Sequence, residues 1–529
     1  MTIAPTKSKT ELSVDFLNSQ RDVIRHILQD CRTLQDFKYG DVRVEVVETR
    51  MGMAQNGQPK LSIEDQRLSV GIRVIAGDGV TAPGYYGFRL GSGRLLTRSL
   101  REGLKHAYVR AIANAREKAA AQKRFGALGA SLSTINLAPI PVVEKQVSPA
   151  MKRDPRSISA EQILSYLLPV SAHIASYHRN VMFNLVWAQT QLRRQFFCST
   201  EGACIDQMNA ITDGMCMVAA RGDDSSAPLH LSESTGHQCG WELMEAGWRE
   251  GPIQLPDFES LSMELARTTV EVAAAPPLKS TEKEVVVVTD PHFNTLLVHE
   301  VVGHPSELDR ALKMETAYAG RSWLLKDLQR NQVGQKVASP YVSAYSDASM
   351  DGYGHYLYDD EGTPARRVYH IDKGIFKGFL NSRQTAAITG ATPNGSYKAT
   401  EADFVPIIRM SNTVFGPGDR DPREIIKEVE SGFYVQGHRI PSVAESRENF
   451  RISCVKVYEI HRGQLGRLYR DGAVMADTRD YFLHVDASGN DFRMFPIPNC
   501  GKGQPMQTKR MSNGGPTMRS VARLVGPVT

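Results

Sequence analysis

The chain has 529 residues, which is enough for two or three domains with full hydrophobic cores. Its composition of 41% hydrophobic, 23% charged and 8% aromatic residues is typical of a globular protein. The formal net charge of +5 arises from interspersed acidic and basic residues, without the basic blocks that indicate nucleic-acid binding.

The cysteines and the N-terminus favour a cytoplasmic protein. Seven cysteines occur without a close Cys-x-x-Cys pair, which favours a reducing compartment over a disulfide framework. The first nine residues lack the apolar core of a signal peptide, and no segment resembles a membrane span. We therefore expect neither membrane nor nucleic acid as a partner.

Hydrophobic periodicity predicts strands and helices in the first half. Apolar residues alternate with polar ones at residues 42–46 and 68–74, which predicts two half-buried strands with a turn at 56–59 between them. A helix is expected at about 99–124, because apolar residues there recur on one stripe. Ser159 and Gln162 predict a capping box for a helix that Pro169 is expected to interrupt.

The second half begins with an all-apolar strand at residues 285–288. Asp290 and Pro291 then predict the start of a helix that leads to residue 299. Farther along the chain, Asp421 and Glu424 predict the start of another helix, which Gly432 is expected to end.

These patterns predict an α+β fold. We expect an N-terminal strand and helix domain at residues 1–279, with room for a subdivision near 140–157, where the chain is rich in proline and basic residues. A β-rich C-terminal domain at 280–529 is expected to carry the metal-binding helix.

Two histidines flank a carboxylate in the sequence His299-Glu300-Val-Val-Gly-His304. In zinc hydrolases, neutral histidines hold the metal and a neighbouring glutamate takes a proton from water. The common motif spaces its histidines at i and i+4, whereas residues at i and i+5 lie about 140° apart on a regular helix. Gly303 and Pro305 predict that the helix widens or ends here, and a π-type turn would also bring both histidines to one metal. The alternative is a polar helix face with two unrelated histidines.

A catalytic zinc site needs a third protein ligand. Side-chain chemistry alone leaves several candidates downstream: Glu307, His355, His370, Cys454, His484 and Cys500. Cys500 lies in a glycine-flanked loop in which a thiolate could face a metal, whereas Cys454 lies in an apparent strand that favours a buried structural thiol. Periodicity does not choose among these candidates.

The second half of the chain resembles the TldD/PmbA family of zinc metallopeptidases over about residues 285–520. The resemblance is carried by six segments in the family's order: 299–304, Gly334-Gln-Lys-Val-Ala-Ser-Pro340, Tyr358-Asp-Asp-Glu-Gly-Thr-Pro364, Arg409-Met-Ser-Asn-Thr413, Cys500-Gly-Lys-Gly-Gln504 and Gly515-Pro-Thr517. Because the histidine motif is intact, the chain is similar to the TldD-type, metal-binding member. It departs from the family pattern at residues 436–441 and in a region that carries Arg447, Glu448, His461 and Arg462.

The resemblance implies that His299, His304 and Cys500 bind one Zn²⁺ per chain and that Glu300 is the catalytic base. It also implies a homodimer, or a heterodimer with a metal-less PmbA-like paralogue, around an enclosed chamber. The expected activity is hydrolysis of amide bonds in short or unfolded peptides.

Three alternatives differ in function. The chain could be a zinc amidase that acts on an aminoacylated small molecule, or a non-catalytic partner subunit that binds peptides by strand addition. The zinc could also be structural, which would require a fourth protein ligand such as Cys454 or His484.

Overall fold

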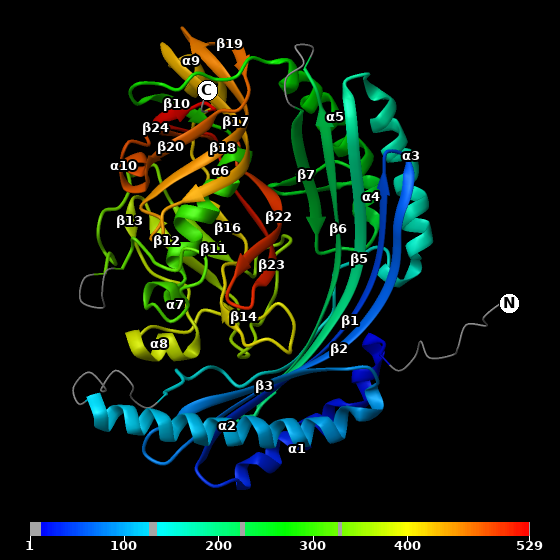
Figure 1. The fold of residues 1–529 in the computed structure, drawn as a ribbon. Coiled ribbons are helices and arrows are strands. Elements are labelled where there is room, and N and C mark those ends of the chain that lie inside the picture. Colours follow the sequence, from blue (N-terminus) through cyan, green and yellow to red (C-terminus); the bar gives the residue numbers. More distant parts are fainter. Residues whose placement is uncertain (1–11, 126–134, 223–227, 326–330, 528–529) are drawn as a thin grey trace, which may run out of the picture.

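The computed structural model describes residues 12–125, 135–222, 228–325 and 331–527. The fold is α+β and rich in strands, as the sequence predicts. Two seven-stranded sheets, one eight-stranded sheet and one two-stranded sheet form its framework (Figure 1). Within these described ranges, no helix combines the length and the apolar composition needed to cross a membrane.

The first sheet has the strand order β3-β2-β1-β5-β6-β4, with β7 beside β6. Its strands are β1 (Phe37–Gln55), β2 (Gln58–Ala76), β3 (Ala82–Leu90), β4 (Glu144–Val147), β5 (Val181–Ser199), β6 (Cys204–Ala220) and β7 (Leu229–His237). Asn56 and Gly57 form the two-residue turn between β1 and β2, and their φ angles of 49° and 74° suit a hairpin whose strands twist in the native sense. The turn predicted from the sequence is therefore confirmed.

Alternation along these long strands gives the sheet two different faces. Even-numbered residues such as Val44, Leu192 and Ala210 are buried beneath helices α1 (Arg21–Asp30) and α2 (Leu96–Phe125). Toward the other end of the same face, α3 (Ala160–Tyr177) and α5 (Phe258–Ala274) pack on the sheet. The sheet curves around the second half of the chain, with these helices on its outer side (Figure 1). Its inner face therefore looks toward the C-terminal sheets.

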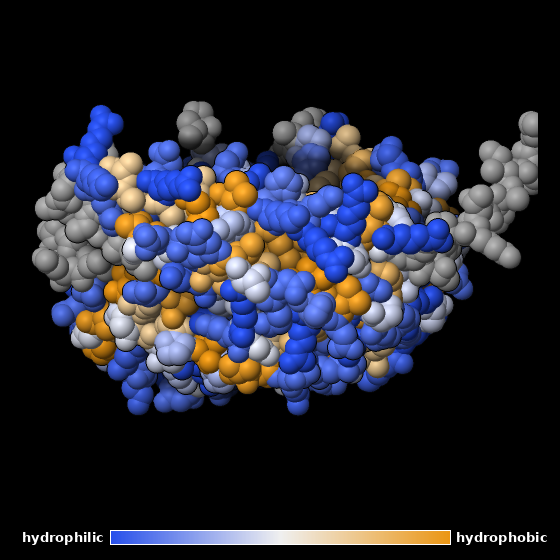
Figure 2. All heavy atoms as spheres, turned by 90° about the horizontal axis from the view of Figure 1, so that it is seen from below, coloured by the Kyte–Doolittle hydropathy of each residue, from blue (hydrophilic) through white to orange (hydrophobic). Residues whose placement is uncertain are grey.

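Helix α2 covers one end of the molecule and confirms the helix expected at about 99–124. Seen from the side of α2, hydrophilic side chains dominate the surface, with smaller apolar patches between them (Figure 2). Arg110 and Lys118 donate hydrogen bonds to the backbone oxygens of Tyr85 and Thr81, so these two cations also fasten the helix to β3.

Pro169 does not interrupt its helix, so that expectation was wrong. Helix α3 begins with the predicted capping box of Ser159 and Gln162 and continues through Pro169 to Tyr177. A proline removes one backbone hydrogen bond, but Leu167 and Val170 on either side are buried in the core. Their burial stabilises the helix beyond the proline.

The C-terminal half builds two sheets that pack together. One has the order β10-β17-β18-β20-β24-β21 with β19 beside β18, and consists of β10 (Val285–Thr289), β17 (Ser431–Val443), β18 (Asn449–His461), β19 (Gln464–Tyr469), β20 (Ala473–Asp477), β21 (Ala487–Ser488) and β24 (Met518–Val525). The other has the order β13-β12-β11-β16-β23-β22-β9-β8, and consists of β8 (Trp248–Glu250), β9 (Ile253–Leu255), β11 (Ala344–Asp347), β12 (Arg367–Asp372), β13 (Ile375–Phe376), β16 (Thr413–Phe415), β22 (Arg493–Lys502) and β23 (Gln507–Gly515). Strands β8 and β9 precede residue 280, so strand pairing spans the division expected there.

Shorter elements complete the described chain: β14 (Tyr397–Lys398), β15 (Ile407–Ile408), α4 (Glu242–Ala246), α6 (Pro291–Val298), α7 (Leu308–Ala311), α8 (Arg383–Thr389), α9 (Pro422–Lys427) and α10 (Thr478–Leu483). The expected end of α9 was wrong. Gly432 lies in β17, and the helix stops at Lys427 because the chain must extend again to pair with β10. Glu424 contacts Lys427 instead of completing a capping box.

Candidate metal centre

A π-helical turn brings the two histidines of the motif together. Helix α6 begins at Asp290, whose carboxylate accepts a hydrogen bond from the backbone N–H of Phe293 at 2.6 Å, as expected. Residues His299–Gly303 then form a π-helical turn, and the N–H of His304 bonds the carbonyl of His299, five residues back. The two imidazole centroids are consequently 4.8 Å apart. The π-type turn considered from the spacing is thus present.

The roles expected of Gly303 and Pro305 are different in the structure. Gly303 has an ordinary helical φ of −61°, so it does not supply an unusual backbone angle. A Cβ at this position would instead meet the Sδ of Met410 at 2.7 Å, so glycine provides space. His304 is also helical, and Pro305 lies inside a 3₁₀ turn (His304–Ser306).

Cys500 joins the histidines from the β22–β23 hairpin. Its Sγ lies 3.5 Å from His304 Nε2. One ligand atom from each of His299, His304 and Cys500 lies within 4.8 Å of the others, and all three residues are buried. The guanidinium of Arg409 donates to the carbonyl oxygens of Cys500 at 2.6 Å and Gln507 at 2.9 Å, which holds the two strands of the hairpin in place.

Neighbouring side chains fix the histidine rings. The amide of Asn513 lies 2.8 Å from His299 Nδ1, and a carboxylate oxygen of Glu307 lies 3.1 Å from His304 Nδ1. Such contacts to the second ring nitrogen orient ligating histidines in metal proteins. Sequence reasoning did not assign Asn513, because its position in β23 gives no signal until the sheet places it beside α6.

Glu307 lies at the centre of a buried ion network behind His304. Its carboxylate also accepts from Arg310 Nε at 2.9 Å and lies 3.2 Å from Lys502 Nζ, and Lys502 lies 2.6 Å from Asp309. Burial would raise the pKa of Glu307, but Lys502, His304 and Arg310 hold it well below its usual range. Glu307 is therefore an anion that contacts the ring of His304 and is not itself part of the three-residue cluster.

The electrostatics of the cluster favour the protonation states that bind a metal. Burial lowers the pKa of His299 and so favours its neutral form. Burial opposes ionisation of Cys500, but His304 and Arg409 lower the pKa of its thiol. Imidazole nitrogens and a thiolate sulfur are ligands that zinc takes in proteins.

Glu300 is positioned by Arg447. The Nε of Arg447 lies 3.6 Å from a carboxylate oxygen of Glu300. Burial would raise the pKa of Glu300, but His299, His304 and Arg447 together lower it, which keeps the group an anion. Arg447 comes from the tip of the β17–β18 hairpin, has a φ of 61°, and also bonds the carbonyl of Ala319. It belongs to the region in which the sequence departs from the family pattern.

The other sequence candidates for the third ligand lie elsewhere. His370 is buried in β12 between Ser346 and the carbonyl of Gly378, Cys454 is buried in β18, and His484 is exposed at the end of α10. His355 lines a separate cavity. In the part of the chain that the structure describes, His299, His304 and Cys500 form the single group of three or more such residues that could hold a metal ion.

Known protein structures include chains with the same fold. The solved structure of TldE from Thermococcus kodakarensis matches 95% of this chain and 100% of its own length, with a TM-score of 0.68 and 15% sequence identity. The two proteins therefore share one fold.

The sequence comparisons then identify the family. Residues 282–522 match the family model described as the PmbA/TldA metallopeptidase C-terminal domain. A metalloprotease of Methanothermobacter thermautotrophicus is 30% identical over 330 residues, which are 62% of this chain and 66% of that relative. A zinc metalloprotease TldD homolog of Saccharolobus solfataricus is 22% identical over 69% of this chain and 76% of its own length. Residues 282–522 of the chain therefore belong to the TldD/PmbA family.

The matches with archaeal relatives do not extend over their whole lengths. The aligned part spans 66% of the M. thermautotrophicus protein and 55% of a metalloprotease of Methanocaldococcus jannaschii.

Proposed function

We propose that this protein is a zinc-dependent metallopeptidase that hydrolyses amide bonds of short or unfolded peptides. The convergence of His299, His304 and Cys500, with Glu300 beside them, carries this proposal. Two imidazole nitrogens and one sulfur fit the ligands that zinc takes in proteins. Cys454 and His484 lie outside the cluster, which favours a fourth position open to water or substrate over a closed structural site.

Each residue of the site would have a separate role in amide hydrolysis. Zinc bound here would supply a Lewis acid for water and for a substrate carbonyl. Glu300, held as an anion, would accept the proton of the attacking water and return it to the leaving amine. Arg447 would direct the Glu300 carboxylate, and Glu307 and Asn513 would hold the two imidazole rings.

Zinc content and peptide cleavage together test this proposal. Elemental analysis of the purified protein should find about one zinc per chain, as expected for a site of this ligand set. Cys500→Ala should lose the zinc, whereas Cys454→Ala, which removes a buried thiol outside the cluster, should keep it. Zinc retained by Cys500→Ala would show that the third ligand is wrong.

The role of Glu300 needs a second measurement. Glu300→Gln should keep its zinc but lower kcat on a cleaved peptide by about 10²–10⁴-fold, the usual contribution of a general base. A panel of unstructured peptides and aminoacylated small molecules separates a peptidase from an amidase. A zinc-loaded Glu300→Gln variant with normal turnover would overturn the assignment of the base.

A further inference from the structure

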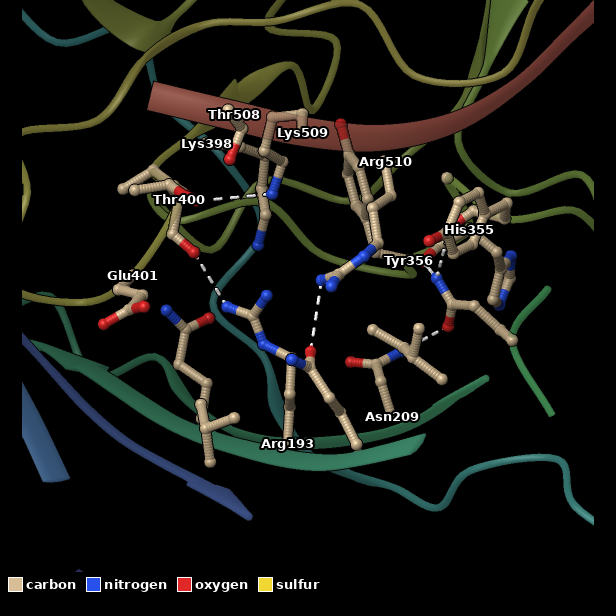
Figure 3. Close-up of a pocket in the computed structure, with 18 of the residues that line it drawn as sticks. Arg193, Asn209, His355, Tyr356, Lys398, Thr400, Glu401, Thr508, Lys509 and Arg510 are labelled. Atoms are coloured by element: carbon tan, nitrogen blue, oxygen red, sulfur yellow. Dashed lines mark hydrogen bonds between the residues drawn. The ribbon is translucent and has the colours of Figure 1, made fainter. Parts of the chain in front are cut away.

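A polar cavity of about 230 Å³ lies between the inner face of the first sheet and the C-terminal half. One wall is formed by β1, β2, β5 and β6, and the other by residues 353–356, residues 398–401 and β23. Figure 3 shows Arg193 extending from the sheet, with Lys509 and Arg510 extending from the opposite wall. The cavity is smaller than the roughly 300–1,000 Å³ of sites for drug-sized molecules, so it suits a ligand of amino-acid or dipeptide size.

The sheet wall is polar where a purely structural interface would be apolar. Odd-numbered positions on β5 and β6 carry Gln191, Arg193, Gln207 and Asn209, whereas the even-numbered positions carry the core. Buried amide and charged groups cost free energy unless they find hydrogen-bond partners. Gln207 and Asn209 already hydrogen-bond other groups of the protein, and a polar wall of this kind suits a polar ligand better than an apolar one.

Most cations around the cavity are neutralised by neighbouring carboxylates. Arg193 pairs with Glu45 at 2.5 Å, Lys398 with Asp360 at 2.5 Å, Arg67 with Glu401 at 2.8 Å and Arg510 with Asp213 at 3.3 Å. These four pairs are internal to the protein and leave no net charge of their own.

Lys509 is the exception. Its Nζ donates to the carbonyl oxygen of Ala399 at 3.2 Å, and no carboxylate in the described ranges forms an ion pair with it. Burial and the neighbouring Lys398 hold the pKa of Lys509 well below its usual range, and Arg193 and Arg409 add to this effect although Asp360 opposes it. An anion beside Lys509 would relieve this repulsion.

His355, which also lines the cavity, carries a ring nitrogen without a hydrogen-bond partner in the described part of the chain. The Nδ1 of His355 is buried and has no hydrogen-bond partner among the described residues, while the His355 carbonyl accepts a hydrogen bond from Gln238. The ring of His355 lies at the cavity wall (Figure 3). An unsatisfied ring nitrogen and a lysine without an ion-pair partner in one small cavity are features expected of a ligand site.

We propose that this cavity binds a small carboxylate, with Lys509 as the counter-charge and the surrounding amides and His355 as hydrogen-bonding partners. Lys509, protonated beside a bound anion, balances the single negative charge of a carboxylate, whereas a phosphate carries about −1.5 to −2. The carboxylate could be the free C-terminus of a short peptide or that of a small organic acid. The binding does not depend on the proposed peptidase activity.

Isothermal titration calorimetry on the full-length protein tests the proposal with four probes. These are N-acetyl-alanyl-alanine, its C-terminal amide, propionate and inorganic phosphate. Binding of N-acetyl-alanyl-alanine but not of its amide supports the site and identifies a peptide terminus, whereas binding of propionate alone identifies an organic acid. A wild-type protein that binds neither carboxylate overturns the proposal, and phosphate as the sole ligand overturns the choice of carboxylate.

Variants assign the binding to the cavity. Lys509→Met should weaken carboxylate binding by about 10–100-fold, the effect of removing a charged hydrogen-bonding partner. Lys509→Arg should retain most of the affinity, and Lys279→Met, which removes an exposed lysine outside the cavity, should change nothing. If Lys509→Arg binds as weakly as Lys509→Met, the loss is structural and the assignment fails. Glu300→Gln should bind like the wild type, which separates this result from the test of the peptidase.

Discussion

The metal-ligand cluster and the polar cavity both contain residues of the β22–β23 hairpin, but they differ in how completely their charged side chains are paired. Cys500 and Lys509 are directly opposite each other in that hairpin. Around Cys500 and His304, the charged side chains of Glu307, Arg310 and Lys502 are 0% exposed and all contact opposite charges. Around Lys509, Arg193 and Arg510 are 21% and 22% exposed, and one ammonium is left unpaired.

Burial decides how complete a polar network must be. A fully buried charge without a partner is costly, so the surroundings of His304 form a closed network. A partly hydrated cavity tolerates an unpaired cation, which leaves that cation available to a ligand. Substitutions should therefore cost stability at the cluster and ligand affinity at the cavity.

The greatest loss of stability should follow from a substitution that disrupts the closed ion network behind His304. Glu307→Ala would remove the carboxylate that both Arg310 and Lys502 contact, leaving Lys502 paired with Asp309. We expect a loss of about 3–5 kcal/mol in the free energy of unfolding. Urea denaturation measures this value. Lys509→Met at the cavity should lose less than about 1 kcal/mol, and equal losses for both variants would contradict the comparison.

A smaller effect on stability is expected from His370, which is fully buried like the residues around His304. Burial lowers its pKa to about 4, from an ordinary value of about 6.5. The unfolded chain therefore binds a proton at higher pH than the folded chain, and stability is lost as the pH falls from about 6.5 to about 4. The difference corresponds to about 3 kcal/mol at most.

The variant His370→Gln isolates this pH dependence. Its free energy of unfolding, measured by urea denaturation at several pH values, should fall less steeply across that window than the wild type. The exposed His461→Gln should reproduce the wild-type slope. An unchanged slope in His370→Gln would mean that His370 does not titrate as a buried core histidine.

The smallest effect is expected at Gly303, where the cluster meets the cavity. A Cβ at residue 303 would contact the flexible end of Met410, which also lines the cavity. The Met410 side chain can move, so Gly303→Ala should cost about 1 kcal/mol or less. Thermal unfolding with and without added zinc checks this estimate, and a loss above about 3 kcal/mol would show that the π-helical turn itself requires glycine.

Local patterns in the sequence determined much of the fold. The Asn56-Gly57 turn, the Ser159–Gln162 capping box and the Asp290 cap depend on contacts within a few residues, so composition and spacing predict them. The predicted helix ends at Pro169 and Gly432 were wrong, because tertiary packing and strand pairing determine the structure there. Core contacts and strand pairing contribute more free energy there than a local breaker removes.

From the sequence alone, His299 and His304 could be predicted as metal ligands and Glu300 as a base. These three residues lie close together along the chain, and their spacing allowed a π-type turn. The choice of Cys500 over Cys454 or His484 came from family resemblance, and only the tertiary structure places its sulfur beside His304. The contacts of Asn513, Arg447 and Lys509 could not be predicted from the sequence for the same reason. Each is separated by more than 100 residues from the group that it contacts. Periodicity describes neighbours a few residues apart and carries no information about such long-range contacts.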